Sequence, residues 1–319
     1  MMKRPFLVFE ITSQCNLNCI FCYNVWHEQS CSIPECSSVL SIGEIDQLFK
    51  KINEEVSPSG FALTGGEPLL YSDIVEVVEI LKTYSDLVNL VSNGLLLTPK
   101  KVDCLVQAGL SHLDISLLSL HKTNYKNMTG FDHLEKIMKI FSFIKKFNVI
   151  FNVSIMVCRM NYSEVNELID FATACGADSV TINVFTPTGR GLKNKNKLNL
   201  QKSEILKLLD LAEMKSEKLN IPINLGIPLE PCIYPLKKYQ HLKFSSCLCG
   251  FIKWVIDPQG NLRICEQSEV VLGSLFRQSF SELSSAEQVK LFRDFNLKKS
   301  CFICSEYKVC RGGCRFRRD

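Results

Sequence analysis

The sequence predicts an α/β fold that consists of a parallel sheet of six β–α units followed by a small cysteine-rich domain. Two observations support this prediction. Apolar strand-like runs alternate with helix-like segments from residue 5 to about residue 217, which is typical of right-handed βαβ units. The composition then changes, and the segment from Cys247 to Cys314, both included, contains seven cysteines. We therefore expect two domains, at residues 1–220 and 221–319.

The elements of the first domain follow one another in regular order. Six strands are predicted at residues 5–11, 60–63, 87–91, 111–117, 149–156 and 179–185. Six helices are predicted at residues 42–55, 72–84, 99–108, 131–146, 162–175 and 201–218. The helix at 162–175 shows the reasoning most clearly, because its apolar residues recur with a helical period. Asn161 provides a cap before it, and Gly176 ends it.

Composition excludes several classes of protein. With 319 residues, 46% of them hydrophobic and 22% charged, the chain is long enough for one large core and an appended module. It has no apolar run of ~18–20 residues and no signal-peptide pattern, so we expect a cytoplasmic protein without a membrane segment. In that compartment 16 cysteines indicate metal binding rather than disulfides.

A net charge of +4 is mild and gives no reason to expect a nucleic-acid partner. Much of the basic excess lies in two groups, which we interpret as solvated faces, with binding of an anionic substrate or peptide as the alternative. These groups are Lys193, Lys195 and Lys197, and Arg311, Arg315, Arg317 and Arg318.

Three cysteines near the N-terminus, Cys15, Cys19 and Cys22, have the spacing C-x3-C-x2-C. Four thiolates close a [4Fe–4S] cluster, so three leave one iron free to bind another molecule. A structural zinc site takes its cysteines in pairs. The segment Gly65-Gly66-Glu67-Pro68 follows a short apolar run. Its glycines permit close backbone approach to a ligand, and its carboxylate is suited to holding an ammonium group.

The triplet and this GGEP segment resemble motifs of the radical S-adenosylmethionine (radical SAM) enzymes, whose fold is a partial (β/α)6 barrel. In that family the open iron chelates the amino and carboxylate groups of S-adenosylmethionine, and reductive cleavage releases a 5′-deoxyadenosyl radical. The resemblance implies that Phe21 packs near the adenine. It also implies that Asn93 and Ser116 contact the ribose and methionine carboxylate, and that Arg190 lies near the adenine end. The alternatives are that Asn93 is a turn former, that Ser116 is a buried strand residue with a local hydrogen bond, and that Arg190 is solvated.

All of these segments follow strands, so we expect them on one rim, where parallel α/β folds bind ligands. His112, His121 and Asp114 lie near the same rim, and we expect structural roles for them. Cys104, Cys158 and Cys175 fall within helix or strand patterns, where cysteine behaves as a small apolar side chain. Cys31 and Cys36 lie in an irregular loop at residues 24–40. Each is a buried structural residue, a hydrogen-atom donor or a neighbour of a cluster, and the sequence leaves these alternatives open.

The second cysteine region contains a predicted hairpin, because two β-rich runs flank the turn residues 257–261. It resembles the SPASM extension of radical SAM enzymes, with Cys249 and Cys265 followed by a C-x2-C-x5-C-x3-C quartet. The quartet is Cys301, Cys304, Cys310 and Cys314.

The SPASM resemblance implies that Cys249, Cys265 and Cys314 hold one auxiliary [4Fe–4S] cluster, with Cys247 or Cys232 as the fourth ligand. Cys301, Cys304 and Cys310 would belong to a second cluster. The family motif has one more cysteine beyond the quartet, so that cluster has an open iron, borrows another ligand or is absent. A zinc quartet is the alternative by cysteine count.

The resemblance implies hydrogen-atom abstraction, and we expect a peptide or small protein as substrate, modified by crosslinking, oxidation or epimerisation. Expected partners are a reductant such as flavodoxin or ferredoxin and a separate leader-binding protein, because no leader-binding module precedes the first strand. A small-molecule enzyme of cofactor, haem-type or antibiotic biosynthesis is the first alternative. A non-catalytic iron–sulfur electron carrier or sensor is the second. The substrate, the bond formed and the hydrogen-atom donor are not evident from the sequence.

Overall fold

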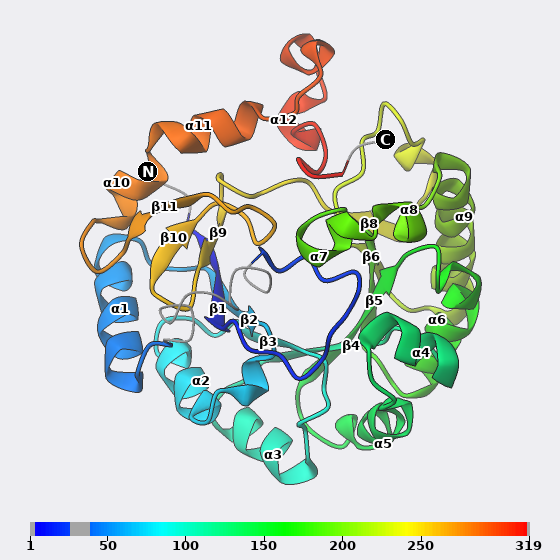
Figure 1. The fold of residues 1–319 in the computed structure, drawn as a ribbon, viewed down its shortest axis with the longest axis horizontal. Helices are drawn as coiled ribbons and strands as arrows, with labels where there is room; N and C mark the ends of the chain where they lie inside the picture. The colour runs from blue at the N-terminus through cyan, green and yellow to red at the C-terminus, as the bar shows by residue number, and fades with distance from the viewer. Residues whose placement is uncertain (1–3, 26–38, 318–319) are drawn as a thin grey trace.

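The structure is a computed structural model that describes residues 4–25 and 39–317 (Figure 1). In these residues eleven strands form one open sheet in the order β11-β10-β9-β1-β2-β3-β4-β5-β6-β7-β8. The strands are β1 (Phe6–Thr12), β2 (Gly60–Gly65), β3 (Val88–Ser92), β4 (His112–Ser116), β5 (Ile150–Val157), β6 (Ser179–Val184), β7 (Ile223–Leu225), β8 (Leu242–Phe244), β9 (Lys253–Ile256), β10 (Asn261–Arg263) and β11 (Val271–Ser274). Strands β1 to β8 pair in parallel. The predicted α/β class and its six parallel strands are confirmed.

Helices lie outside the strands (Figure 1). The α-helices are α1 (Ile42–Glu55), α2 (Ile74–Lys82), α3 (Pro99–Gln107), α4 (Lys122–Thr129), α5 (Leu134–Ile144), α6 (Val165–Ala174), α7 (Gly189–Lys193), α8 (Lys195–Leu198), α9 (Lys202–Leu219), α10 (Phe280–Ser284), α11 (Glu287–Asp294) and α12 (Tyr307–Cys310). Short 3₁₀ helices lie at η3 (Pro68–Leu70), η4 (Tyr162–Glu164), η5 (Leu236–Lys238) and η6 (Lys299–Ile303). All six predicted helices are present. Helix α4 was not predicted, because its mostly polar sequence buries only Tyr125, Met128 and Thr129.

The strands in the middle of the sheet have one apolar and one polar face. In β4, Leu113 and Ile115 are fully buried, whereas Asp114 and Ser116 alternate with them and are only partly buried. Strands β5 and β6 show the same alternation. Because successive side chains of a strand point to opposite faces, the apolar face packs on the helices and the polar face turns inward. The sheet therefore encloses a polar interior.

The chain after residue 220 adds strands at both ends of the same sheet. Strands β7 and β8 extend it beyond β6, and β9 pairs in parallel with β1. The predicted hairpin is confirmed, since β9 and β10 are antiparallel. The Asp257 side chain forms its turn by accepting hydrogen bonds from the backbone N–H groups of Gln259 and Asn261. The division at residue 220 stays a prediction.

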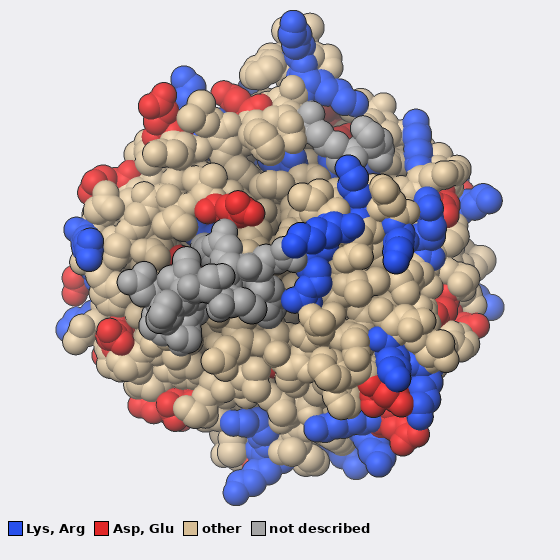
Figure 2. Space-filling model, viewed as in Figure 1, with Lys and Arg blue, Asp and Glu red and all other residues tan. Residues whose placement is uncertain are grey.

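The two basic groups differ in their surroundings. Lys193, Lys195 and Lys197 are exposed, as expected for a solvated face. Arg315 and Arg317 are buried, so a solvated face is wrong for these two residues. Figure 2 shows lysine and arginine side chains interspersed with acidic ones at the margin of the molecule, and a further group of them near the centre of the view. Among the described residues, no helix combines the length and apolar character needed to cross a membrane.

Candidate functional site

A cavity of about 540 Å³ opens where the sheet encloses its polar interior. It brings together the N-terminal cysteine triplet and four cysteines of the C-terminal region. The predicted residues that line it are Cys15, Cys19, Phe21, Cys22, Gly65, Gly66, Glu67, Asn93, Ser116, Cys247, Cys249, Cys265 and Cys314. Pro68 begins the neighbouring helix η3, and Arg190 lies in α7. The residues predicted to share one rim therefore converge on one cavity and its border.

The three thiols of the triplet lie in an environment that suits a metal cluster. Backbone N–H groups of Leu17 and Asn24 donate to the sulfurs of Cys15 and Cys22. Burial raises the pKa of Cys15 to about 11, and burial together with the neighbouring thiols raises the pKa of Cys19 further. Ionising them in the empty protein is therefore costly, and a cationic iron–sulfur core offsets this cost by binding thiolates.

Helix α7 and the residue after it donate hydrogen bonds to backbone carbonyl groups of the loop that carries the three cysteines. Arg190 Nη1 donates to the carbonyl oxygen of Cys19 at 3.2 Å, and the Gly191 N–H donates to that of Cys22 at 3.0 Å. Asn194 Nδ2 adds a bond to Ile20 O at 3.0 Å. The Arg190 guanidinium also acts to lower the pKa of each of the three thiols. In this structure Arg190 supports the loop that carries the cysteines.

The GGEP segment packs on the start of the same loop by backbone contacts. The Gly66 N–H donates to Thr12 O and the Glu67 N–H to Gln14 O, both at 2.7 Å. A Cβ atom at Gly66 would lie 2.0 Å from Gln14 O, and Gly65 has a φ of +141°. Only glycine permits this approach and this backbone conformation without strain. The two motifs of the sequence thus form one unit.

Glu67 is buried and orders the loop that follows β3. Its carboxylate accepts hydrogen bonds from Ser92 Oγ at 2.7 Å and from the Asn93 N–H at 2.8 Å. A third bond comes from the Leu69 N–H at 3.1 Å. A carboxylate has about four acceptor sites, so capacity remains for an ammonium group in the cavity. Burial raises the pKa of Glu67, although these hydrogen bonds oppose the shift.

Asn93 and Ser116 both line the cavity but differ in their local bonds. Asn93 Oδ1 accepts from the Leu95 N–H at 3.0 Å, and its Nδ2 donates to Asn16 Oδ1 at 2.7 Å. These bonds make the Asn93 side chain part of a turn. Ser116 lies at the end of β4, in register with Ser154 of β5. Contact of either residue with the cofactor stays a prediction.

The polar wall contains residues that the sequence reasoning missed. Ser154 and Asn183 line the cavity, and Asn183 Nδ2 donates to Ser154 Oγ at 2.9 Å. Asp114, which was expected near this rim in a structural role, also lines the cavity, and burial raises the pKa of its carboxyl group to about 7. Within the described part of the chain, Asp114 Oδ1 is buried without a hydrogen-bond partner. The polar alternation in β4 to β6 was the available signal. His112 and His121 are absent from the lining.

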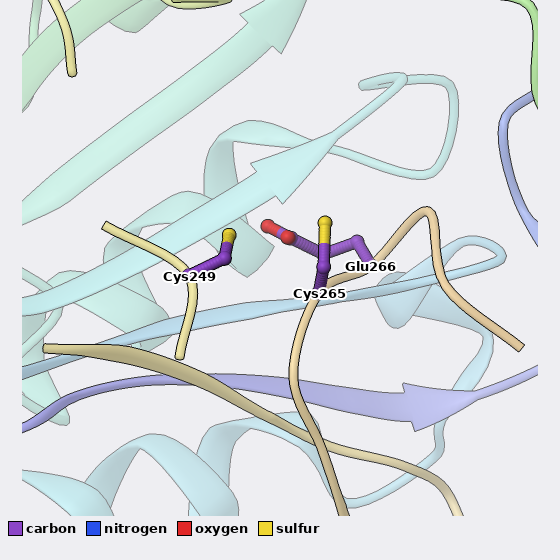
Figure 3. A group of neighbouring side chains, drawn as sticks. All are labelled: Cys249, Cys265 and Glu266. Carbon is purple, nitrogen blue, oxygen red and sulfur yellow. The ribbon is translucent and has the colours of Figure 1, made fainter. Parts of the chain in front are cut away.

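Cys247, Cys249 and Cys265 are buried together beside the triplet, and the Cys314 thiol is an electrostatic neighbour of Cys247. Figure 3 shows the Cys249 and Cys265 thiols pointing to the same side, with the Glu266 carboxylate between them. Their ligand atoms lie within 4.8 Å of one another. Hydrogen bonding to Cys249 and burial raise the pKa of Cys247. This donor set fits an auxiliary iron–sulfur cluster.

Lys253 and Glu266 form an ion pair at the edge of this group, and both line the cavity. Burial acts to lower the pKa of Lys253, but Glu266 and Cys249 raise it by more. The Glu266 carboxylate therefore lies next to the Lys253 ammonium group and to the thiols of Cys249 and Cys265. Sequence reasoning missed this pair, because neither residue belongs to a cysteine motif.

The remaining cysteines fall into three sets. A second cavity of about 400 Å³ is lined by Cys232, Cys301, Cys304, Cys310 and Cys314. Cys158 is buried in the core, and Cys104 and Cys175 are partly buried in helical segments. Cys31 and Cys36 lie outside the described residues.

The open parallel sheet and the two groups of thiols define an α/β iron–sulfur protein. A model of the radical SAM superfamily matches residues 9–172, more than half of the chain, and a model of the SPASM iron–sulfur cluster-binding domain matches residues 247–311. The chain belongs to the radical SAM superfamily. Its cofactors are therefore [4Fe–4S] clusters and S-adenosylmethionine, as the resemblance implied.

Three similar proteins illustrate the range of this superfamily. An AdoMet-dependent heme synthase of Methanosarcina barkeri is 27% identical, over 99% of this chain and 93% of its own. A PqqA peptide cyclase of Bradyrhizobium diazoefficiens is 23% identical, over 97% and 80%. The crystal structure of Streptococcus suis SuiB bound to the precursor peptide SuiA has a TM-score of 0.78 at 17% identity, covering 98% of this chain and 72% of that one.

Proposed function

We propose that this radical SAM enzyme abstracts a hydrogen atom from a peptide or small protein and so crosslinks, oxidises or epimerises it after translation. The observation that carries the proposal is the single cavity lined by both the triplet and the auxiliary cysteines. A substrate in that cavity lies between a source of radicals and a second redox centre. An auxiliary cluster in contact with the cavity suits a reaction in which the substrate radical loses an electron.

Named residues take defined roles in this proposal. Cys15, Cys19 and Cys22 hold the first cluster, which together with bound S-adenosylmethionine supplies the 5′-deoxyadenosyl radical. The remaining acceptor capacity of Glu67 receives the ammonium group of the cofactor, and Phe21 packs on its adenine. The auxiliary cluster is held by Cys247, Cys249, Cys265 and Cys314.

Among the polar residues of the cavity, Glu266 is placed to accept a proton from the substrate. It faces the cavity beside the auxiliary cysteines, and the Lys253 ammonium stabilises its charged form. The Lys253 cation lowers the pKa of Glu266 against the effect of burial, so this carboxylate is ionised at neutral pH. Oxidation of a substrate radical commonly releases a proton, and an ionised carboxylate is a suitable base.

Two comparisons support a peptide as the substrate class. A similar chain is named as a peptide cyclase, and a similar fold has been seen with a precursor peptide bound. A reductant such as flavodoxin or ferredoxin supplies the electron for cofactor cleavage, and a separate protein delivers the leader segment of the peptide.

To test the proposal, anaerobically reconstituted protein is incubated with S-adenosylmethionine, dithionite and a peptide encoded beside its gene. The peptide is deuterated at candidate positions. We expect deuterium in 5′-deoxyadenosine and either a peptide that has lost two hydrogen atoms, one of them the deuterium, or an epimerised peptide in which hydrogen has replaced the deuterium. A Glu266→Gln variant should still form 5′-deoxyadenosine but release much less product. Formation of 5′-deoxyadenosine without deuterium or altered peptide, for every neighbouring peptide tested, would contradict the peptide proposal.

A small molecule is the second candidate substrate. It is favoured by the heme synthase relative, which aligns over 99% of this chain. The same assay with a carboxylated tetrapyrrole as substrate separates the two candidates, because only the true substrate transfers deuterium to 5′-deoxyadenosine.

A further inference from the structure

We propose that Cys232 is the fourth thiolate of a second auxiliary iron–sulfur cluster, together with Cys301, Cys304 and Cys310. These four cysteines line one cavity of about 400 Å³ near the C-terminus. Cys232 lies some seventy residues before the other three in the chain and belongs to none of the spacing motifs. The fold alone brings it to them.

Hydrogen bonds before and after Cys232 in the chain tie its segment to the C-terminal segment. Before it, Pro228 O accepts a hydrogen bond from the Cys314 N–H at 3.3 Å. After it, the Tyr234 hydroxyl accepts a bond from Arg317 Nη2 at 2.8 Å. The buried Arg317 also lies 3.7 Å from the Glu230 carboxylate. The turn that carries Cys232 is therefore fixed to the C-terminal segment rather than free in solvent.

The C-terminal segment approaches this turn through glycine. A Cβ atom at Gly313 would lie 2.6 Å from the side chain of Glu230. The N–H groups of Gly312 and Gly313 donate to the sulfur of Cys310. Cys232 and Glu230 are electrostatic neighbours of the same sulfur. Backbone N–H donors of this kind fix the position of a sulfur that would bind the cluster.

Charge around the cavity suits a thiolate-bound cluster. Its lining includes Lys237, Lys238, Lys298 and Arg317, against Glu230 and Glu306. Four thiolates give a [4Fe–4S] cluster net negative charge. Lys298 adds a positive charge beyond the pairs that Lys237, Lys238 and Arg317 form with Glu306, Asp210 and Glu230. Cys232 and Cys304 are exposed, which places the cluster near the surface, accessible to an external electron donor.

Cys314 lines both cavities, but its neighbours assign it to the first. Its thiol is an electrostatic neighbour of Cys247, whose thiol is hydrogen-bonded to that of Cys249 in the first cavity. With Cys314 assigned there, Cys232 completes the second set. The sequence left Cys247 and Cys232 as alternatives for one position, and in this proposal each takes a position of its own.

The first test compares thiol accessibility in the reconstituted holoprotein and in the same protein after its iron is chelated. Iodoacetamide labelling is followed by peptide mass spectrometry. We expect Cys232 to be protected at least tenfold in the holoprotein, despite its exposed position, and Cys175 to react equally in both states. Equal labelling of Cys232 in the two states would overturn the proposal.

The second test measures iron and sulfide in Cys232→Ala, with Cys175→Ala as the matched control. We expect Cys232→Ala to lose about one to four iron atoms per chain, with an altered electron paramagnetic resonance spectrum. Unchanged circular dichroism and 5′-deoxyadenosine formation show that the variant folds and keeps its first cluster. Wild-type iron content and spectrum in Cys232→Ala would contradict the assignment. These readouts do not depend on the substrate class.

Discussion

The ion pair between Arg263 and Glu10 links the C-terminal hairpin to the first strand, and its removal should destabilise the protein. Arg263 ends β10 and Glu10 lies in β1, and their side chains are 0% and 2% exposed. Arg263 also donates to the backbone carbonyl groups of Glu266 and Ser268, just after Cys265. One guanidinium therefore supports both the sheet and the loop of the auxiliary cysteines.

An Arg263→Met variant keeps much of the side-chain volume but leaves the Glu10 carboxylate buried without this cation. Breaking a buried ion pair by removing one partner costs about 3–5 kcal/mol. We expect a loss of that size in the free energy of unfolding, measured by anaerobic urea denaturation with circular dichroism. Adding Glu10→Gln should recover part of the loss, because the double variant no longer buries a Glu10 carboxylate that lacks the Arg263 cation.

The matched control is Lys145→Met, which removes one partner of the exposed pair with Asp178. Its effect should be much smaller, because solvent screens exposed pairs. A loss below about 1 kcal/mol for Arg263→Met, or no recovery in the double variant, would refute the reasoning.

Three further predictions concern the cavity. Gly66→Ala should abolish cofactor cleavage and lower solubility because its Cβ meets Gln14 O, whereas Gly43→Ala, with open space, should behave as wild type. Since burial raises the folded pKa of Asp114 from 3.8 to about 7, the folded state loses stability as pH rises from about 4 to 7. Asp114→Asn should flatten that slope in urea midpoints between pH 5 and 8, and an unchanged slope would exclude Asp114 as its source. Cys314→Ala should lower iron content and abolish substrate turnover but spare uncoupled cofactor cleavage, and full product formation would make the auxiliary cluster structural.

The sequence was sufficient for the six β–α units because each strand is a short apolar run between helical periods. It was also sufficient for the convergence of the triplet and GGEP, since segments that follow parallel strands meet at one edge. The spacing of Cys249 and Cys265 around a turn indicated the hairpin in the same way. These features are local patterns with a fixed geometric consequence.

Other features depend on contacts between segments far apart in the chain. Nothing near Arg190 in the sequence indicates that its guanidinium bonds Cys19 O. Arg263 and Glu10 form a contact although they are 253 residues apart in the sequence. The position of Cys232 follows only from the fold of the C-terminal segment. The sequence of β4 to β6 shows the alternation of apolar and polar residues, but a strand with one face in solvent has the same pattern. Only the folded structure shows that this polar side lines a cavity.

The most direct test of the central claim is 5′-deoxyadenosine formation by the full chain. Anaerobically reconstituted protein receives S-adenosylmethionine and dithionite, beside a variant with Cys15, Cys19 and Cys22 replaced by alanine. We expect 5′-deoxyadenosine and methionine from the wild type and none from the variant, which should retain iron at its C-terminal cysteines. Failure of the iron-loaded wild type to cleave the cofactor, or equal cleavage by the variant, would contradict the account.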